Sequence, residues 1–340
     1  MRDENLLKEL CELWGVGGYE KDVRKYIAKI VEPYADEMLT DPMGNLIVLK
    51  KGRGGAESKK IMYTAHMDEI GFMVKTIEAD GKLRVCNMGW NWTAAAYCER
   101  VRFRNGLYGV IRCMGNPEEM HNDSGKLYVD IGAVSKEDAE KYVKLGDCCC
   151  YADPYVELLN GRICAKAFDD RVGCYQLIEA LKENDGTFPN DCYYVFDVQE
   201  ELGCRGSVTA AARIAPDVGI SVDITPAHDY PCDLEGSNAL DQGIGIKICD
   251  PSVVSDEEVV ALMEQCCTEN GIKYQREVID KGGTDSSSMN RSGWGVRTGG
   301  IVVVTRYSHS QSSVISKADT EAGIDLITAF SKKTIIWEES

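Results

Sequence analysis

Acidic and imidazole side chains follow the apolar runs of this sequence at five places. Three short segments carry most of them: TAHMDEIG at 64–71, AFDDRVG at 167–173 and VQEELG at 198–203. Two single residues, Asp223 and His309, follow the apolar runs GISV and IVVVTRYS. In an open α/β sheet, ligands bind in the crevice beyond the carboxyl ends of the strands. These five chain segments, with two histidines and several carboxylates, therefore predict one convergent metal site.

The first two segments suit metal binding in different ways. His66 and Asp68 are two residues apart at a strand end, so their side chains leave on the same side. A metal-bound histidine commonly has a carboxylate at its other ring nitrogen, and Asp68 is placed to supply it. Asp169 and Asp170 fall where a helix starts, and aspartate is a favoured N-cap. Because two aspartates exceed the needs of a cap, we expect one to bridge two cations while Arg171 compensates the negative charge.

Glu200 and Glu201 follow the apolar run YYVFDV. A pair of carboxylates at a buried strand end repels and is costly unless cations or a shared proton balance it. Adjacent side chains diverge, so one glutamate can ligate a metal while the other faces a metal-bound water as general base. A solvated turn is the alternative interpretation of this segment.

Taken together, these candidates are two histidines and three carboxylates with a spare glutamate. Two divalent ions that share one carboxylate and a water are typical of co-catalytic hydrolases. Carboxylate and imidazole ligands suit Zn²⁺, Co²⁺ or Mn²⁺. The sequence has neither a phosphate-binding glycine loop nor a GxSxG serine motif. His121 and His228 are interpreted as loop residues, although His228 could line the pocket.

The elements that must position these residues alternate between strand and helix on both sides of a β-rich stretch. Residues 45–50 (NLIVLK) predict a strand, and IMYTA leads into His66 as another. Between about 75 and 160, short apolar segments alternate with Gly, Asn and Asp turns, which predicts a small barrel or sandwich. The later elements are expected to be helices at 169–184, 256–270 and 319–333 and strands at 192–198, 218–222 and 301–305. We predict a discontinuous α/β catalytic domain (1–74 plus 160–340) and an inserted β domain (75–159).

Length and charge restrict the class of protein further. At 340 residues the chain exceeds the roughly 250–300 residues at which single cores stop growing, which favours two domains. A net charge of −17 argues against nucleic acid or an anionic membrane as partner. No apolar stretch approaches the roughly 20 residues that span a bilayer, and the N-terminal segment has no signal-like apolar core. We expect a soluble, cytoplasmic protein.

Fifteen cysteines are present, and none forms a C-x-x-C pair. Their odd number prevents complete internal pairing, and runs such as 148–150 rarely meet disulfide geometry. We interpret them as small buried hydrophobic residues kept reduced, rather than as redox or catalytic thiols.

Over almost its whole length the sequence resembles the glutamyl aminopeptidase and tetrahedral (TET) aminopeptidase family of dinuclear metallo-aminopeptidases, some of whose members were once named endoglucanases. The motifs that carry the resemblance, in matching order and spacing, are GVGGYEKDVR (15–24), AHMDEIGF (65–72), YVDIGAVSKEDAE (128–140), AFDDRVG (167–173), VQEELGCRG (198–206), DITPAHD (223–229), GGTDSSS (282–288) and RYSHS (306–310). The resemblance implies an α/β fold: a mixed-sheet α/β/α metallopeptidase domain with an inserted, small β-barrel-like (PDZ-like) domain.

The resemblance also implies a role for each candidate residue. Glu200 corresponds to the general base and Asp68 to the partner of His66. The implied metal ligands are Asp169 between the two ions, His66 with Asp223 on one ion, and Glu201 with His309 on the other.

The implied activity is removal of the N-terminal residue from peptides with a free N-terminus. A water that bridges two divalent ions, Zn²⁺ first and otherwise Co²⁺ or Mn²⁺, would attack the first carbonyl. The inserted domain would support dimers and hollow tetrahedral dodecamers, whose interior admits peptides.

Three positions depart from the family pattern without touching the implied ligands. The segment GWNWTAAAYCERV (89–101) lacks the Asp that usually follows the first Trp and the Gln soon after it. Arg297 replaces a usual proline, and His228 stands where a small uncharged residue is common.

Three other functions compete with the peptidase. A related dimetal deacylase or carboxypeptidase would use the same metal site on another substrate class. A glycosidase would need two carboxylates that flank a sugar, without metal. A non-catalytic shell or peptide-binding assembly conflicts with Glu200, which has no obvious structural duty.

Overall fold

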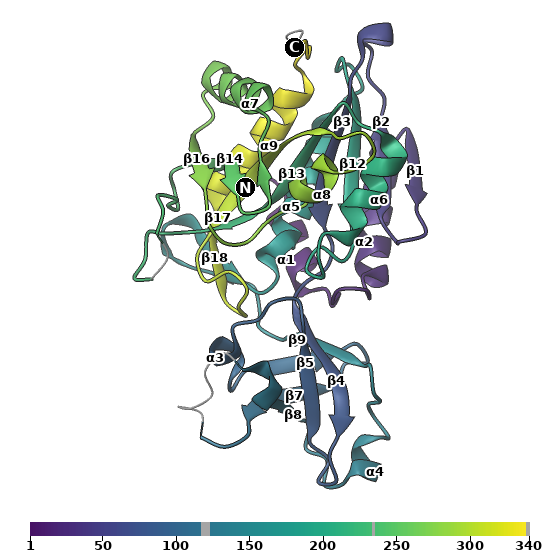
Figure 1. The fold of residues 1–340 in the computed structure, drawn as a ribbon, viewed down its shortest axis with the longest axis vertical. Coiled ribbons are helices and arrows are strands. Elements are labelled where there is room, and N and C mark those ends of the chain that lie inside the picture. The colour runs from purple at the N-terminus through teal and green to yellow at the C-terminus, as the bar shows by residue number, and fades with distance from the viewer. Residues whose placement is uncertain (117–122, 233–234, 338–340) are drawn as a thin grey trace.

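The chain folds into an α/β lobe and a smaller β lobe that hangs from one end of it (Figure 1). The computed structural model describes residues 1–116, 123–232 and 235–337. The α/β lobe contains a nine-stranded mixed sheet in the order β1-β2-β12-β3-β13-β17-β14-β15, with β16 paired to β14. Its strands are β1 (Glu37–Thr40), β2 (Leu46–Lys50), β3 (Lys60–His66), β12 (Asp191–Asp197), β13 (Val218–Pro226), β14 (Ile244–Asp250), β15 (Val253–Val254), β16 (Tyr274–Val278) and β17 (Arg297–Thr305).

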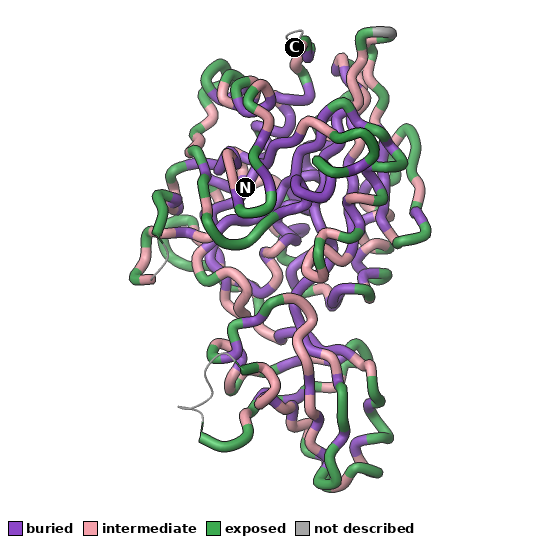
Figure 2. The backbone as a smooth tube through the Cα atoms, in the orientation of Figure 1, coloured by how far each residue is buried: buried purple, intermediate pink, exposed green. Residues whose placement is uncertain are grey.

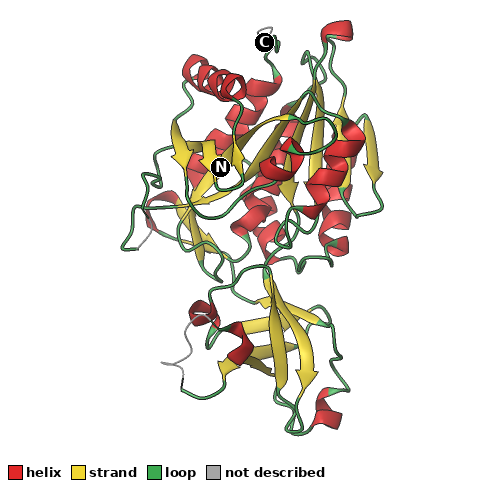
Figure 3. Cartoon of the chain, in the orientation of Figure 1, coloured by secondary structure: helices red, strands yellow, loops and turns green. Residues whose placement is uncertain are grey.

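Helices cover both faces of this sheet (Figure 3). The alternation of side chains along β3 explains why both faces are apolar: Ile61 and Tyr63 pack in one core cluster and Met62 in another. One face packs against α1 (Glu4–Glu12), α2 (Lys21–Val31), α5 (Phe168–Glu183), α7 (Glu257–Asn270) and α9 (Lys317–Ser331). The other packs against α6 (Arg205–Ile214) and α8 (Ser286–Asn290). The central strands are accordingly almost entirely buried (Figure 2).

The smaller lobe is a closed antiparallel barrel with its own core, which includes Phe72, Val85 and Ile111. Its strands are β4 (Gly71–Ile77), β5 (Leu83–Met88), β6 (Arg100–Phe103), β7 (Tyr108–Cys113), β8 (Leu127–Asp130) and β9 (Cys148–Tyr151), with short helices α3 (Thr93–Ala96) and α4 (Lys136–Ala139). A three-stranded sheet of β10 (Val156–Glu157), β11 (Arg162–Ala165) and β18 (Ser313–Ser316) then leads into α5. The α/β fold class with an inserted barrel is confirmed, whereas the boundaries at 75 and 159 stay a prediction.

Most predicted elements lie within a few residues of their expected bounds, but β13 is longer than the expected strand at 218–222. It continues to Pro226 because Ile224 and Thr225 remain paired with Val303 and Val304 of β17. Asp223 therefore lies inside a strand and not in the turn after it.

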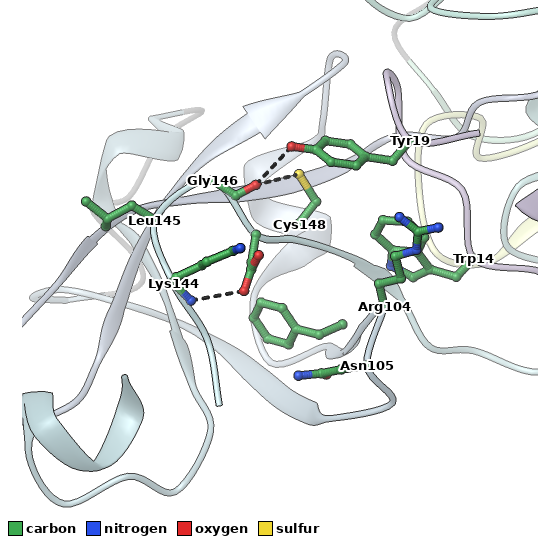
Figure 4. Close-up of a pocket in the computed structure, with 10 residues that line it drawn as sticks. Trp14, Tyr19, Arg104, Asn105, Lys144, Leu145, Gly146 and Cys148 are labelled. Carbon is green, nitrogen blue, oxygen red and sulfur yellow. Dashed lines mark hydrogen bonds between the residues drawn. The ribbon is translucent and has the colours of Figure 1, made fainter. Parts of the chain in front are cut away.

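A hollow of about 560 Å³ lies where the two lobes meet (Figure 4). Trp14 donates from its indole Nε1 to the carbonyl of Arg102 at 3.2 Å, and Tyr19 donates its hydroxyl to the carbonyl of Gly146 at 3.2 Å. Both bonds join the N-terminal segment of the α/β lobe to the barrel. None of the predicted metal ligands lines this hollow.

No disulfide joins any of the cysteines, all of which lie among the described residues. Cys174 and Cys192 are buried as expected, whereas Cys164 is only partly covered and Cys98 is exposed. Of the helices in the described residues, not one has the length and apolarity to cross a membrane.

A buried ion cluster connects the start of α5 to the N-terminal segment. Arg171 is fully buried, and it donates from Nε to the carbonyl of Met67 at 2.9 Å and from Nη1 to that of Leu10 at 2.6 Å. Its guanidinium lies 3.6 Å from Glu69, and Lys166 Nζ lies 2.7 Å from the other oxygen of that carboxylate. The expectation that Arg171 compensates the charge of the adjacent aspartates is therefore wrong, because its acidic partner is Glu69.

Replacing Arg171 with methionine should destabilise the α/β lobe. The change removes the donors to two buried carbonyls, at about 1–3 kcal/mol each, and one of the two cations that face Glu69, so the free energy of unfolding should fall by about 2–6 kcal/mol. Urea unfolding followed by circular dichroism measures this cost. The control is Arg276→Met, whose partner Glu264 forms an exposed pair worth less than about 1 kcal/mol. Equal effects of the two substitutions would contradict this account.

Candidate metal centre

The candidate site lies at the carboxyl ends of four adjacent strands. β12, β3, β13 and β17 run parallel, so their carboxyl ends meet at one edge of the sheet. Thr64 pairs with Ser221 at the last paired position between β3 and β13. His66 and Asp223 each lie two residues beyond that pair, where the strands no longer pair and a crevice can open.

Asp169 lies between the two candidate histidines. Its Oδ1 is 3.0 Å from His66 Nε2, and its Oδ2 is 3.1 Å from His309 Nε2. His66 is the last residue of β3, whereas His309 lies in the loop between β17 and β18. One carboxylate therefore faces two imidazoles that come from distant parts of the chain, one with each oxygen.

Two groups of potential ligand atoms share this aspartate. His66, Asp169 and Asp223 form one group, and Asp169, Glu201 and His309 form the other, with the atoms of each group within 4.8 Å of one another. The structure thus brings together all five residues that the sequence predicts as ligands. Two groups joined by one carboxylate match what a pair of bridged cations requires.

Asp68 contacts His66 mainly through its backbone. The Nδ1 atom of His66 lies 3.1 Å from the Asp68 carbonyl oxygen and 3.5 Å from its carboxylate Oδ1. The two carboxylate oxygens accept the backbone N–H groups of Glu200 at 3.1 Å and Glu201 at 3.2 Å. Asp68 therefore orients the imidazole and also fixes the loop that carries both glutamates. Nothing in the sequence signals this second contact.

Asp170 does not belong to either ligand group. Its Oδ1 accepts the backbone N–H of Gly173 at 2.9 Å, and its Oδ2 accepts that of His66 at 3.3 Å. The capping interpretation thus fits Asp170, whereas Asp169 is the aspartate at the centre of the site.

The barrel contributes one wall of the site. The loop after β5 brings the carbonyl oxygen of Trp90 to 2.7 Å from His309 Nδ1, so this nitrogen donates to it. Gly89 has φ +75°, and a Cβ there would lie 2.8 Å from Glu201 Oε2. Both contacts bring the loop close to the ligand side chains, and sequence reasoning missed them because they join residues far apart in the chain.

Glu200 lies beside the two ligand groups but in neither. Its Oε2 atom is 3.9 Å from His66 Nε2. Burial raises the pKa of Glu200 well above its usual value; His66 opposes the rise, and Asp285, Asp223 and Glu201 add to it. A carboxyl group in such surroundings is suited to exchange protons near neutral pH once a positive charge lies nearby.

The candidate ligand residues also have strongly shifted pKa values. Burial raises the pKa of Glu201 to about 8 and moves that of Asp223 well above the usual range. Burial acts to lower the pKa of His66 and His309, but neighbouring carboxylates outweigh it and raise both. Burial also acts to raise the pKa of Asp169, yet hydrogen bonds from the two histidines lower it overall. These shifts favour the neutral form of Glu201 and Asp223, the charged form of both imidazoles and the ionised form of Asp169.

The donor set suits divalent cations. Imidazole nitrogens and carboxylate oxygens are ligands of Zn²⁺, Co²⁺ and Mn²⁺. Within the described residues, Glu201 Oε1 is buried and accepts no hydrogen bond, which is costly for a carboxylate without a cation. Of the other two histidines, His228 belongs to neither ligand group. His228 Nδ1 accepts the backbone N–H of Asn238 at 3.2 Å, and His121 lies outside the described residues.

Residues 44–326 match the M42 glutamyl aminopeptidase family. This match covers most of the chain. The chain belongs to the M42 glutamyl aminopeptidase family. It is thus an aminopeptidase of the metallopeptidase type, as the resemblance implied, and the TET aminopeptidases are among its structural relatives.

Relatives and solved structures agree over nearly the whole length. A protein of Acetivibrio thermocellus with the provisional name aminopeptidase is 39% identical, covering 95% of this chain and 96% of that protein. The lysyl aminopeptidase of Pyrococcus furiosus is 32% identical, covering 97% and 96%. Aminopeptidase APDkam598 of Desulfurococcus kamchatkensis has a TM-score of 0.92 at 34% identity, covering 97% and 94%. The TET1 peptidase of Pyrococcus horikoshii, named as able to assemble into a tetrahedron or a large octahedral shell, has a TM-score of 0.85 at 30% identity, covering 96% and 98%.

The pKa values of this M42 chain predict how its stability depends on pH when cations are removed. A folded Glu201 with a pKa of about 8, against an ordinary value of 4.5, contributes its full stability below pH 4.5 and loses it as the pH rises through 8. The raised pKa values of Glu200, His66 and His309 act in the same direction.

The chelated protein should therefore melt at a lower temperature at pH 8 than at pH 5, and added Zn²⁺ should remove most of this difference. Calorimetric scans with and without chelator measure it. A chelated protein that gains stability between these pH values would contradict the shifts.

Proposed function

We propose that the chain is a dinuclear metallo-aminopeptidase that removes the N-terminal residue from peptides. The observation that carries the proposal is Asp169, whose two oxygens face the imidazoles of His66 and His309. A single carboxylate between two ligand groups, with an unused glutamate beside them, suits a bridged metal pair better than a structural ion, which would be fully enclosed by ligands.

His66, Asp169 and Asp223 would hold one ion, and Asp169, Glu201 and His309 the other. Zn²⁺ is the first candidate, with Co²⁺ or Mn²⁺ as alternatives. When bound, two such ions supply Lewis acidity that polarises the first carbonyl of the peptide and activates the attacking water.

Glu200 is the residue we assign to proton transfer. It would take a proton from the attacking water onto its carboxylate and later return that proton to the leaving amine. Positive charge beside it would lower its raised pKa, so that the carboxylate is ionised when the reaction begins. Asp68 keeps Glu200 in place through the backbone N–H bond and orients His66 at the same time.

The substitution Glu200→Gln tests this assignment. Because it removes proton transfer but keeps the shape of the side chain, kcat should fall about 10²–10⁴-fold while both ions stay bound. Rates on aminoacyl-nitroanilides and metal content by elemental analysis are measured together. The matched control is Glu201→Gln, which should lose affinity for one ion. Full activity of Glu200→Gln would refute the role.

The same assay separates the peptidase from its competitors. Free peptides should be cleaved one residue at a time from the N-terminus, and N-acetylated copies should be inert. Cleavage of the acetyl group would favour a deacylase, and chelator-resistant activity on β-glucans would favour a glycosidase. Absence of turnover by protein with two bound ions would favour a non-catalytic shell.

We also propose that the chain self-associates through dimers, with a tetrahedral dodecamer as the complete assembly. The barrel offers an apolar surface for the first step, because Tyr108 and Val110 both point outward from β7 and are exposed. Isolated apolar residues are common on surfaces, but neighbours along one strand favour a protein contact. The names of the TET relatives support the larger assembly.

Native mass spectrometry of the intact chain tests this assembly. We expect a multiple of the 37.6 kDa chain mass, and a smaller species for the double substitution Tyr108→Glu, Val110→Glu, since buried charges would oppose the contact. A double variant of the exposed lysines Lys75→Glu and Lys136→Glu controls for charge alone. A monomeric wild-type protein would contradict the proposed self-association.

A further inference from the structure

The loop between β12 and α6 carries the proposed general base, and its backbone carbonyls bond within the loop. The carbonyl of Glu200 accepts the N–H groups of Gly203 at 2.8 Å and Cys204 at 2.9 Å, and that of Gln199 accepts the N–H of Arg205 at 3.2 Å. The thiol of Cys204 also lies 3.1 Å from Glu200 Oε1. These local bonds close a turn, but they do not attach it to the rest of the protein.

The backbone N–H groups of the same loop bond to side chains from three distant segments. Asn45 Oδ1 accepts the N–H of Val198 at 3.2 Å, and Glu20 Oε1 accepts that of Gln199 at 3.1 Å. The next two N–H groups, which belong to the pair of glutamates, bond to the carboxylate of Asp68. Four successive N–H groups are thus held by side-chain oxygens from elsewhere in the chain.

Glu20 is the member of this set to which the resemblance assigns no role. It lies directly before α2, and only 4% of its surface is exposed, so water cannot readily replace it as an acceptor. The same Oε1 atom accepts the N–H of Gly18 at 2.6 Å, and one oxygen therefore joins the turn before α2 to the loop of the general base. Burial and the charge of Asp68 raise the pKa of Glu20 to about 7, and backbone donors oppose this rise. The neutral and the ionised carboxyl both keep an oxygen that accepts these bonds.

The bond from Gln199 to Glu20 lies where the backbone conformation is unfavourable. Gln199 has φ +58°, in the left-handed region that residues other than glycine rarely adopt. Such a conformation persists only where the surrounding contacts hold it. A change at Gln199 would turn the next peptide unit and move the carboxylate of Glu200, whose Oε2 now lies 3.9 Å from His66 Nε2.

We propose that Glu20 is a positioning residue for the general base. By accepting the N–H of Gln199, it holds that residue in its left-handed conformation, and Glu200 then keeps the direction that proton transfer requires. A displacement of about 1 Å at a reacting group can cost about 10²-fold in rate. The effect on the rate, but not the fixing of the loop, rests on the proposed function of Glu200.

Three substitutions separate the hydrogen bond of Glu20 from its charge. Glu20→Gln keeps the accepting oxygen without the charge, Glu20→Asp keeps the charge on a side chain one methylene shorter, and Glu20→Ala keeps neither. On aminoacyl-nitroanilides, kcat should fall about 10²-fold in the alanine and aspartate variants and stay close to the wild-type value in Glu20→Gln. KM and the content of two ions should not change, because Glu20 belongs to neither ligand group.

Asp319→Ala is the matched control. Asp319 is likewise buried, and its carboxylate accepts two backbone N–H groups of one loop, those of Asp241 at 2.7 Å and Gly243 at 2.8 Å. The control should lose stability, as Glu20→Ala does, but keep its kcat. An equal fall of kcat in both alanine variants would overturn the positioning role, and so would a slow Glu20→Gln, an unchanged kcat in Glu20→Ala or the loss of an ion from it.

Hydrogen exchange followed by mass spectrometry tests the fixing of the loop without any activity. Amides in peptides that span 198–204 should exchange faster in Glu20→Asp than in the wild type, and at the wild-type rate in Glu20→Gln. The aspartate variant carries the test if Glu20→Ala does not fold. Equal exchange in the wild type and Glu20→Asp would overturn the proposal. Faster exchange in Glu20→Asp, together with a wild-type chain that holds two ions and cleaves no peptide, would instead refute the proposed function and leave the loop contact standing.

Discussion

The accumulation of buried and partly buried carboxylates at one edge of the sheet is the constraint on which the rest of the structure depends. The acids concerned are Asp68, Asp169, Asp170, Asp197, Glu200, Glu201, Asp223 and Asp285. Two imidazoles, His66 and His309, are the basic side chains that directly face them in the described residues. Such a concentration of like charge is unfavourable in a protein interior unless backbone donors, shared protons or bound cations offset it. Backbone donors satisfy Asp68 and Asp170, but Glu201 Oε1 has no hydrogen-bond partner among the described residues. The negative charge that remains is the physical basis for binding cations here.

A few residues away, a buried carboxylate is balanced by cationic side chains of the chain itself. Glu69 is buried between Lys166 and Arg171, and Arg171 bonds as well to carbonyls of the N-terminal segment. The Glu69 carboxylate thus has counter-charges from the protein itself and needs no bound ion. Arg171 is paired with Glu69, and in the part of the chain that the structure describes, the ion pairs of Asp169 are with histidines. The Glu69 cluster has its own counter-charges, whereas the acids around Asp169 do not have enough of them. Both clusters include residues at the start of α5.

Much of this arrangement could be predicted from the sequence, and the failures have definite causes. The strand that ends at His66 and the helix that begins near Asp169 follow from local apolar periodicity, and the convergence of acids follows from their place after strands. Asp223 was expected after its strand, but pairing with β17 extends β13 beyond it. The contacts of Trp90 with His309 and of Cys204 with Glu200 depend on loop conformation. Loop conformation leaves no periodic signal, so neither contact could be predicted. The prediction that Arg171 compensates the adjacent aspartates was wrong because its acidic partner, Glu69, belongs to a different segment of the sequence.

The hydrogen bond between the carbonyl of Trp90 and His309 has a consequence for how the chain can be divided. By topology the barrel is an insert with its own core, which suggests a module that could be gained, lost or exchanged. Yet its backbone fixes the ring orientation and the tautomer of an imidazole that faces the central aspartate of the other lobe. A foreign insert would have to reproduce one carbonyl in one position to preserve that ring. The two lobes therefore have separate cores, but the geometry at His309 depends on both of them.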